Sequence, residues 1–329
     1  MNVLVLGGSR FVGWYIVHSL LKAGHQVSVF NRGRSNTDLP AEVEQLVGDR
    51  NTDLSALQGR SWDAVIDVNA YVPRQVRQIV EVLKGRVEHY VLVSTISVYS
   101  DSAEVPITEE SPVIELENKD TEEVTGETYG GLKVLCERTL AELWGEKHTI
   151  LRLGLVVGGR DLTFRFPFWV KRALEGDEMI APNKPVSPVQ FVFVKDIADF
   201  AVHTVENQIY GTFNTVREPE LWGEVLREIV QQAGTDAPLT WVDGNFLLEQ
   251  GVRPWMDLPI WLPEQPEFIG MLSVSDRKAK LNGMPSSPLP EVVEDMVTWA
   301  KTQPDEAFKE GLSKERIREI LNAWHALHP

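Results

Sequence analysis

Tyr129 and Lys133 are four residues apart in the stretch YGGLKVLCERTL, which predicts a helix. At that spacing, the two side chains share one face of the helix. An ammonium group beside a phenol favours the phenolate and lowers the tyrosine pKa from its usual value of about 10. Such a phenol can exchange a proton with a carbonyl or alcohol oxygen at neutral pH. The pair therefore predicts an acid/base site, and the alternative is an exposed helix pair without chemistry.

Thr95 offers a second hydroxyl for the same oxygen. It ends the largely apolar run VLVST, 34 residues before Tyr129. A short apolar run of this kind predicts a buried strand of a parallel sheet. We therefore expect the Thr95 hydroxyl to lie at the end of that strand, within reach of a substrate oxygen that Tyr129 contacts.

The first thirteen residues, MNVLVLGGSRFVG, predict a phosphate-binding turn. Residues 3–6 predict a strand buried on both faces, and residues 11–21 predict an amphipathic helix. Gly7 permits a tight turn, Gly13 lets the helix lie close to the strand, and the free N–H groups at the helix start attract a pyrophosphate. The middle position of the G-x-x-G-x-x-G spacing is Arg10, so a strand–turn–helix without a ligand is the alternative.

Predicted strands and helices alternate from the first residue onward, which is typical of an α/β, doubly wound parallel sheet of the Rossmann type. We expect this dinucleotide-binding domain in residues 1–160 and 189–216. A smaller, mostly helical substrate-binding lobe is expected in residues 161–188 and 217–329, with the active site between the two. The predicted strands of the sheet cover residues 3–6, 26–30, 44–47, 64–68, 90–93 and 149–157.

Several motifs occur in order along this pattern. The segment STISVYS, residues 94–100, matches Ser-(Ser/Thr)-x-x-Val-Tyr-Gly except at Ser100. Together with Tyr129 and Lys133, it resembles the extended short-chain dehydrogenase/reductase family, which includes nucleotide-sugar epimerases and dehydratases. Further matches are Gly48-Asp49, Arg152 in the sixth strand, FVFVKDIA at residues 191–198 with Asp196 as a structural helix cap, and, loosely, residues 273–289.

The resemblance implies an NAD(P)-dependent oxidoreductase or epimerase/dehydratase that transfers hydride between nicotinamide and a small carbonyl or alcohol substrate. Thr95 would orient the substrate oxygen, Tyr129 would be the acid/base, and Lys133 would tune the phenol and hold the nicotinamide ribose. The residues expected to contact the dinucleotide are Gly7, Ser9, Arg10, Phe11, Val12, Gly13, Asn31, Arg32, Asp49, Arg50, Asn69, Ala70, Tyr129 and Lys133.

The substrate prediction rests on Leu155 and on an aromatic loop. Nucleotide-sugar enzymes of the family often carry an asparagine where this chain has Leu155. We therefore expect a small molecule with an apolar or aromatic part in place of a typical nucleotide-sugar. Phe246, Trp255 and Trp261 would contact that part, and the alternative is that these rings only pack the second lobe.

The second strand ends in NRGR, residues 31–34, with no carboxylate before Asp38. NAD-specific relatives usually carry an acidic residue there, which binds the ribose 2′-OH. A guanidinium instead pairs with a 2′-phosphate, so Arg32, with Arg10 from the neighbouring turn, predicts NADP(H) in preference to NAD(H). The alternative is that both arginines are solvent-exposed and select nothing.

The composition of the chain argues against several kinds of partner. The net charge of −16 argues against nucleic acid, and the single cysteine with scattered histidines predicts no disulfide and no metal site. No apolar run reaches the roughly 18 residues of a membrane span. We expect a cytoplasmic protein, with a homodimer as one candidate assembly. LGGSRFVG and VFNRG also resemble chloroplast stem-loop RNA-binding relatives, so a non-catalytic NAD(P)-binding or RNA-binding protein is the rival function.

Overall fold

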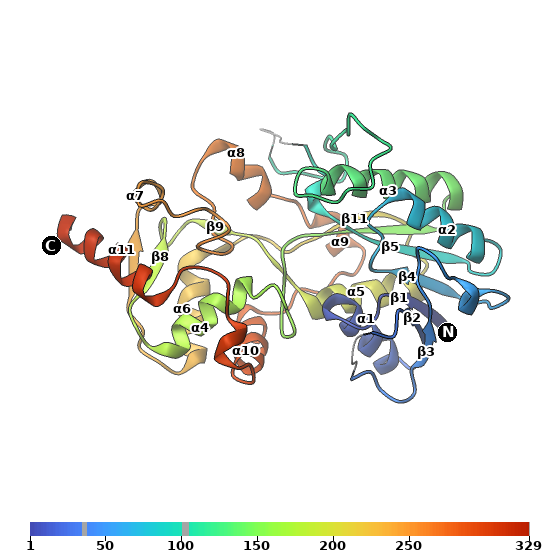
Figure 1. The fold of residues 1–329 in the computed structure, drawn as a ribbon, viewed down its shortest axis with the longest axis horizontal. Coiled ribbons are helices and arrows are strands. Elements are labelled where there is room, and N and C mark those ends of the chain that lie inside the picture. Colours follow the sequence, from blue (N-terminus) through green and yellow to red (C-terminus); the bar gives the residue numbers. More distant parts are fainter. Residues whose placement is uncertain (35–37, 101–104, 329) are drawn as a thin grey trace. The chain divides into compact units, whose positions relative to one another are not determined.

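The computed structural model describes residues 1–34, 38–100 and 105–328 (Figure 1). These described residues form two compact units. Unit 1 comprises Met1–Val156, Val194–Arg217 and Val274–Ser286, and unit 2 comprises Val157–Phe193, Glu218–Ser273 and Ser287–Pro329.

Residues 274–286 lie in unit 1, although the sequence predicts that everything after residue 216 joins the second lobe. The reason is a pairing between distant segments. The backbone N–H of Ser275 donates to the carbonyl of Ile107 at 2.8 Å, and helix α9 (Arg277–Leu281) packs beside strand β11 (Gly211–Thr215). Neither contact leaves a local sequence signal.

In the described residues, unit 1 contains a seven-stranded sheet with the order β11-β6-β5-β4-β1-β2-β3. All neighbouring strands run parallel, which confirms the predicted doubly wound sheet. The strand order reverses at β1, where such sheets bind ligands at their carboxyl edge. The strands are β1 (Asn2–Leu6), β2 (Gln26–Asn31), β3 (Glu44–Val47), β4 (Ala64–Asp67), β5 (His89–Thr95), β6 (His148–Leu153) and β11 (Gly211–Thr215).

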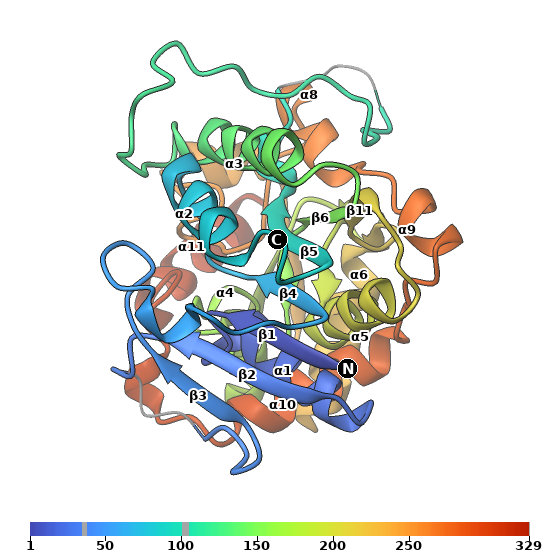
Figure 2. The same cartoon turned by 90° about the vertical axis from the view of Figure 1, so that its right-hand side faces the viewer.

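Helices cover both faces of this sheet, so its central strands are buried and apolar. Figure 2 shows α1 (Phe11–Lys22) and α5 (Val194–Glu206) on one face, and α2 (Pro73–Leu83) and α3 (Tyr129–Trp144) on the other. The helices of each pair pack against one another. The core beneath α2 and α3 includes Leu4, Val76, Tyr90, Cys136 and Leu140.

Unit 2 is mainly helical and has its own core. Helices α4 (Arg165–Glu175), α6 (Trp222–Ala233) and α10 (Leu289–Ala300) pack against one another. The buried Trp169 contacts Trp222 edge-on and donates from Nε1 to the carbonyl of Pro259 at 2.8 Å. The other elements are β8 (Met179–Pro182) parallel to β13 (Leu239–Val242), β9 (Pro188–Val189) antiparallel to β12 (Glu220–Leu221), α7 (Gly244–Glu249), α8 (Pro266–Ile269) and α11 (Lys314–Leu327).

Predicted element bounds differ from the structure most clearly at the sixth strand and at the helix predicted from Asp196. The sequence predicts the sixth strand over residues 149–157, but β6 ends at Leu153, and β7 (Val156–Val157) pairs instead with β10 (Val192–Phe193). The helix predicted from Asp196 begins at Val194, which places Asp196 in its first turn. Short 3₁₀ turns η1 (Ser55–Leu57), η2 (Ile96–Val98), η3 (Gly270–Leu272) and η4 (Asp305–Ala307) complete the chain.

None of the helices in the described part of the chain is long and apolar enough to cross a membrane. Within the same residues, no group of three or more His, Cys, Asp or Glu side chains is placed to hold a metal ion.

Candidate active site

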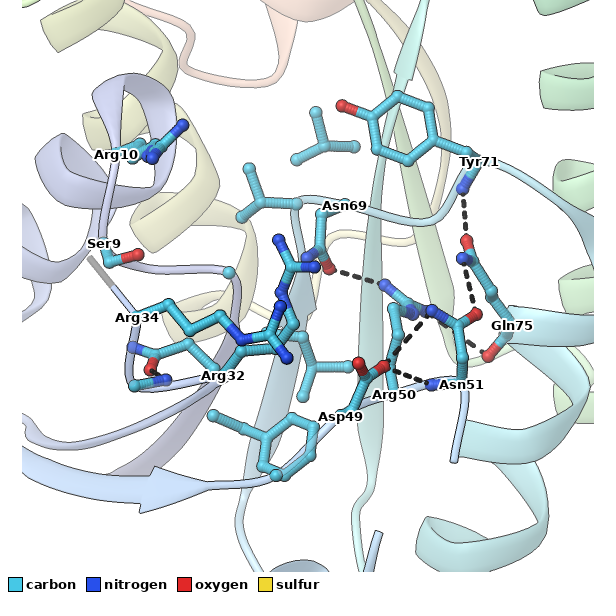
Figure 3. A pocket seen from close by; sticks show the side chains of 18 of the residues that line it. Ser9, Arg10, Arg32, Arg34, Asp49, Arg50, Asn51, Asn69, Tyr71 and Gln75 are labelled. Carbon is cyan, nitrogen blue, oxygen red and sulfur yellow. Dashed lines mark hydrogen bonds between the residues drawn. The ribbon is translucent and has the colours of Figure 1, made fainter. Parts of the chain in front are cut away.

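A pocket of about 550 Å³ lies in unit 1 at the carboxyl ends of β1, β2, β3 and β4 (Figure 3). Its wall includes most of the residues that the sequence predicts for the dinucleotide. Those residues are Gly7, Ser9, Arg10, Phe11, Val12, Asn31, Arg32, Asp49, Arg50 and Asn69. The wall also contains residues that the sequence reasoning missed, among them Arg34, Asn51, Tyr71, Gln75 and Val93.

The glycine turn after β1 has the geometry of a phosphate cradle. Gly7 has φ +92°, a left-handed conformation that favours glycine. A Cβ on Gly13 would lie 2.4 Å from the carbonyl oxygen of Gly7, so the predicted close approach of helix and strand is present. Arg10 has φ −140° and precedes the first residue of α1. This extended conformation suits any residue, which explains why the middle glycine is dispensable here.

The start of α1 provides the groups that a pyrophosphate needs. The first N–H groups of a helix have no intrahelical acceptor, and the helix dipole places partial positive charge there. Ser9, Phe11 and Val12 line the pocket at this point. The cradle and the helix start together fit the phosphates of a dinucleotide.

Two arginines extend from the turn after β2 into the pocket. Figure 3 shows Arg32 and Arg34 between Ser9 and Asp49, and both are exposed. The N–H of Asn51 and, more weakly, the charges of Arg32 and Arg34 lower the pKa of the Asp49 carboxyl. The pocket edge therefore carries more positive than negative charge beside the end of β2.

Asn31 shapes that turn. Its Oδ1 accepts from the N–H of Gly33 at 2.8 Å, which fixes the chain just before Arg34. The Asn31 side chain thus already has a partner in the turn where the sequence predicts a ligand contact.

Arg50 lines the pocket and is at the same time paired with the protein around it. Its guanidinium is 8% exposed and donates two hydrogen bonds of 2.8 Å to Asp67. It also donates to Oδ1 of Asn69 at 2.5 Å. Burial raises the pKa of Asp67, but the Arg50 charge and the hydrogen bonds from Arg50 and Tyr90 leave it lowered. Arg50 therefore braces the pocket floor and holds Asn69, because most of its donors are engaged by the protein.

Lys133 links α3 to the pocket wall. Its Nζ donates to the carbonyls of Ala70 and Val93, each at 2.7 Å. The side chain is 4% exposed, and burial lowers the pKa of the ammonium group. An ammonium has three donors, so one remains for a further acceptor. Val93 lines the pocket, so Lys133 lies directly behind that wall.

Tyr129, the first residue of α3, differs electrostatically from the prediction. Burial and the neighbouring phenol of Tyr71 raise the pKa of Tyr129, and only a hydrogen bond with Thr95 opposes them. The predicted lowering of this pKa by Lys133 is therefore wrong. The physical reason is that the Lys133 ammonium is directed to two backbone carbonyls, while partial burial of Tyr129 disfavours the phenolate.

Thr95 ends β5 and caps η2. Its Oγ1 accepts from the N–H of Ser97 at 3.1 Å and donates to Oγ of Ser97 at 3.1 Å. The same hydroxyl also lowers the pKa of the Tyr129 phenol. A substrate oxygen would compete with Ser97 for the Thr95 hydroxyl.

A buried network supports this end of α3. Glu137, one turn beyond Lys133, accepts from Oγ of Ser94 at 2.5 Å and from Nη2 of Arg152 at 2.7 Å. Arg152 also donates to the hydroxyl of Tyr99 at 2.9 Å. The sequence reasoning missed Glu137, although its position four residues after Lys133 places it on the same helix face.

A seven-stranded doubly wound sheet with a glycine turn at its switch point defines a Rossmann-type α/β protein. Residues 3–215 match the model of the NAD dependent epimerase/dehydratase family, so the chain belongs to this family. The resemblance inferred from the motifs is thus confirmed.

One curated relative is named for stem-loop binding and not for an enzymatic activity. The chloroplast stem-loop binding protein of 41 kDa b from Arabidopsis thaliana is 28% identical over 223 residues, which are 63% of this chain and 56% of that relative. The match therefore spans little more than half of the relative's length.

Solved structures share the fold at low identity. The UDP-N-acetylglucosamine 4-epimerase from Bacillus cereus is 19% identical, with a TM-score of 0.67 over 93% of this chain and 98% of its own. The UDP-glucuronic acid 4-epimerase from Bacillus cereus, solved in complex with NAD, is 20% identical, with a TM-score of 0.67 over 92% of this chain and 97% of its own. At these identities the likeness establishes the fold.

Proposed function

We propose that this protein is an NAD(P)-dependent oxidoreductase or epimerase/dehydratase that acts on a carbonyl or alcohol through Thr95, Tyr129 and Lys133. The observation that carries the proposal is the position of Lys133. Its ammonium group contacts the carbonyl of Val93 in the pocket wall and projects from the same helix as Tyr129. Family membership supports an enzyme of this kind.

The chain's own groups can move one proton at the substrate oxygen. A bound nicotinamide dinucleotide supplies or accepts the hydride at the substrate carbon. In reduction, the Tyr129 phenol donates its proton to the carbonyl oxygen, and in oxidation the phenolate takes that proton from the alcohol. The raised pKa of Tyr129 keeps the phenol protonated at neutral pH, which suits the donor role. Lys133 would use its remaining donor on a ribose hydroxyl.

The test is Tyr129→Phe, assayed by nicotinamide absorbance on a panel of carbonyl compounds and alcohols. We expect turnover to fall by about 10²–10⁴-fold, because the proton donor is lost, while dinucleotide affinity changes little. Tyr210→Phe is the matched control, since Tyr210 packs edge-on against His89 and not against this site. Full turnover in Tyr129→Phe would refute the assignment.

We also propose a preference for NADP(H). Arg32 and Arg34 lie at the end of β2, and Arg10 lines the pocket from the neighbouring turn. One charge-assisted contact to a phosphate contributes roughly 1.5–3 kcal/mol, so the preference should exceed about tenfold. The support comes from these residues alone, since the UDP-glucuronic acid epimerase was solved with NAD.

Dissociation constants for both dinucleotides, measured by calorimetry on wild type and Arg32→Asp, test this preference. We expect Arg32→Asp to weaken NADP(H) and to shift the preference toward NAD(H), because the new carboxylate repels the 2′-phosphate. Arg318→Asp makes the same change in charge on helix α11 of unit 2 and should leave both constants unchanged. Equal wild-type affinities for the two dinucleotides would count against the proposal.

The substrate we propose has an apolar or aromatic part and is not a typical nucleotide-sugar. Leu155 is half-buried after β6, which supports the proposal. The aromatic argument is weaker than predicted, because Trp261 is only 1% exposed and Phe246 packs against Trp324. Tight binding of a UDP-sugar in calorimetry would contradict this substrate class.

The second candidate function is RNA binding, and the observation that favours it is the name of the Arabidopsis relative. Exposed Arg10, Arg32 and Arg34 at the pocket supply the positive charge that phosphates require. We favour the enzyme because Thr95, Tyr129 and Lys133 are all retained. The cytoplasmic location and the homodimer stay predictions, and the Arabidopsis relative is named as chloroplastic.

A further inference from the structure

Tyr71 is a large, half-exposed ring at the pocket with no role in the function proposed above. It follows β4, lines the pocket and is 45% exposed. Figure 3 shows its ring extending over the pocket, with the hydroxyl directed away from Gln75. A half-exposed ring contributes little to the hydrophobic core. Its position at the rim of the pocket therefore indicates a role in the pocket.

The backbone around Tyr71 is held on both sides. Oε1 of Gln75 accepts from the N–H of Tyr71 at 2.8 Å and from that of Val72 at 3.4 Å. On the other side, Nζ of Lys133 donates to the carbonyl of Ala70. The same ammonium group that contacts the pocket wall thus also fixes the peptide before Tyr71.

The ring of Tyr71 faces two of the residues assigned to catalysis. Nζ of Lys133 lies 5.9 Å from the ring centroid, within the range of a cation–π contact. The ring centroids of Tyr71 and Tyr129 are 6.4 Å apart and tilted by 43°. Lys133 itself is 4% exposed. A half-exposed ring beside a buried ammonium and a half-buried phenol has the position of a cover.

We propose that Tyr71 is a positioning residue of the candidate active site, whose ring shields Lys133 and Tyr129 from water. Its effect on catalysis rests on the proposed function, whereas the shielding itself does not. The pKa of Tyr129 supports the idea, because burial and the Tyr71 phenol are the main causes that raise it, with the buried thiol of Cys136 a weaker one. Tyr71 would thereby keep Tyr129 protonated, as a proton donor requires.

The first test is the reactivity of Lys133 toward acetic anhydride at neutral pH, read for each lysine by mass spectrometry. Tyr71→Ala should raise the labelling rate of Lys133 at least about tenfold, because the cover is removed. Tyr71→Phe keeps the ring and should leave the rate near wild type. Lys84, whose Nζ donates to the carbonyl of Leu143, serves as an internal reference. An unchanged Lys133 rate in Tyr71→Ala would overturn the proposal.

The second test is the ionisation of Tyr129, followed by phenolate absorbance as the difference between each protein and its Tyr129→Phe counterpart. The apparent pKa of Tyr129 should fall in Tyr71→Phe, which lacks the second phenol. It should fall further in Tyr71→Ala, which also admits water. A Tyr129 pKa that does not move in either variant would overturn the proposal. Neither test measures turnover. Full activity of Tyr129→Phe would therefore refute the proposed function, whereas the labelling of Lys133 and the pKa of Tyr129 would still decide whether Tyr71 shields these residues.

Discussion

His89, the first residue of β5, is a histidine held without charge. It is 3% exposed, with Nε2 2.7 Å from Oγ1 of Thr149 and the ring of Tyr210 edge-on at 4.8 Å. Burial, together with the nearby His148, lowers the pKa of His89 to about 4. Because its pKa lies lower in the folded chain than in the unfolded chain, protonation of His89 opposes folding.

We predict that this residue makes the protein less stable in mild acid. Between about pH 6.5 and about pH 4, the unfolded chain binds a proton at His89 that the folded chain does not, so stability falls as pH falls. From about pH 7 to about pH 5, the contribution to the free energy of unfolding is roughly 2 kcal/mol.

Urea unfolding of wild type and His89→Gln at the two pH values measures this contribution. The glutamine keeps a polar partner for Thr149 but does not titrate in this range. Wild type should therefore lose roughly 2 kcal/mol more than the variant on acidification. Equal losses in the two proteins would show that His89 is not the group that responds.

At the scale of elements, the first turn of α3 is fixed by two glycines. A Cβ on Gly130 would lie 2.0 Å from the carbonyl oxygen of Ser97, in η2. A Cβ on Gly131 would lie 2.4 Å from Cγ of Leu116 in the preceding loop. The missing side chains thus allow α3 to approach η2, and this approach brings Tyr129 beside Thr95.

We predict that Gly130→Ala destabilises the protein by about 1–3 kcal/mol, since the methyl group meets a backbone oxygen that cannot rotate away. Turnover should fall as well, because the turn that carries Tyr129 must shift. Gly126→Ala is the matched control in the loop just before α3, where an added Cβ meets nothing within 4 Å. Thermal unfolding and nicotinamide absorbance give both readouts, and a fully stable, fully active Gly130→Ala would contradict the packing argument.

At the scale of the whole molecule, the charge balance separates the two candidate functions. The chain carries 32 lysines and arginines against 48 aspartates and glutamates, which gives the net charge of −16. Binding to a nucleic acid backbone needs clustered positive charge and weakens steeply with salt. The arginines at the pocket form one such cluster, but on a strongly acidic protein.

We therefore predict that the protein does not retard a stem-loop RNA in a gel, even at low salt. If wild type does retard the RNA, the same gel is run with Arg32→Asp to test whether the pocket arginines cause the shift. A shift that wild type shows and Arg32→Asp loses would establish that the pocket arginines bind RNA, and it would favour the second candidate function.

The sequence by itself predicted the sheet of unit 1 closely. Short buried strands between helices have a strong local signal, because both faces of a parallel strand are apolar. The predicted third strand coincides with β3 (Glu44–Val47), and the glycine spacing of the first turn corresponds to a real close approach at Gly13. Strand ends are also local features, so most of the predicted dinucleotide residues line one pocket.

Only the tertiary structure decided which polar groups pair with one another. Lys133 contacts carbonyls 63 and 40 residues earlier in the chain, and Arg50 pairs with Asp67 across two strand ends. These partners reverse the predicted effect on the Tyr129 pKa and give Arg50 a bracing role. The pairing of β8 with β13 in unit 2 also joins segments that are far apart in the sequence. Long-range pairing depends on how whole elements stack, and that information is absent from any local run of residues.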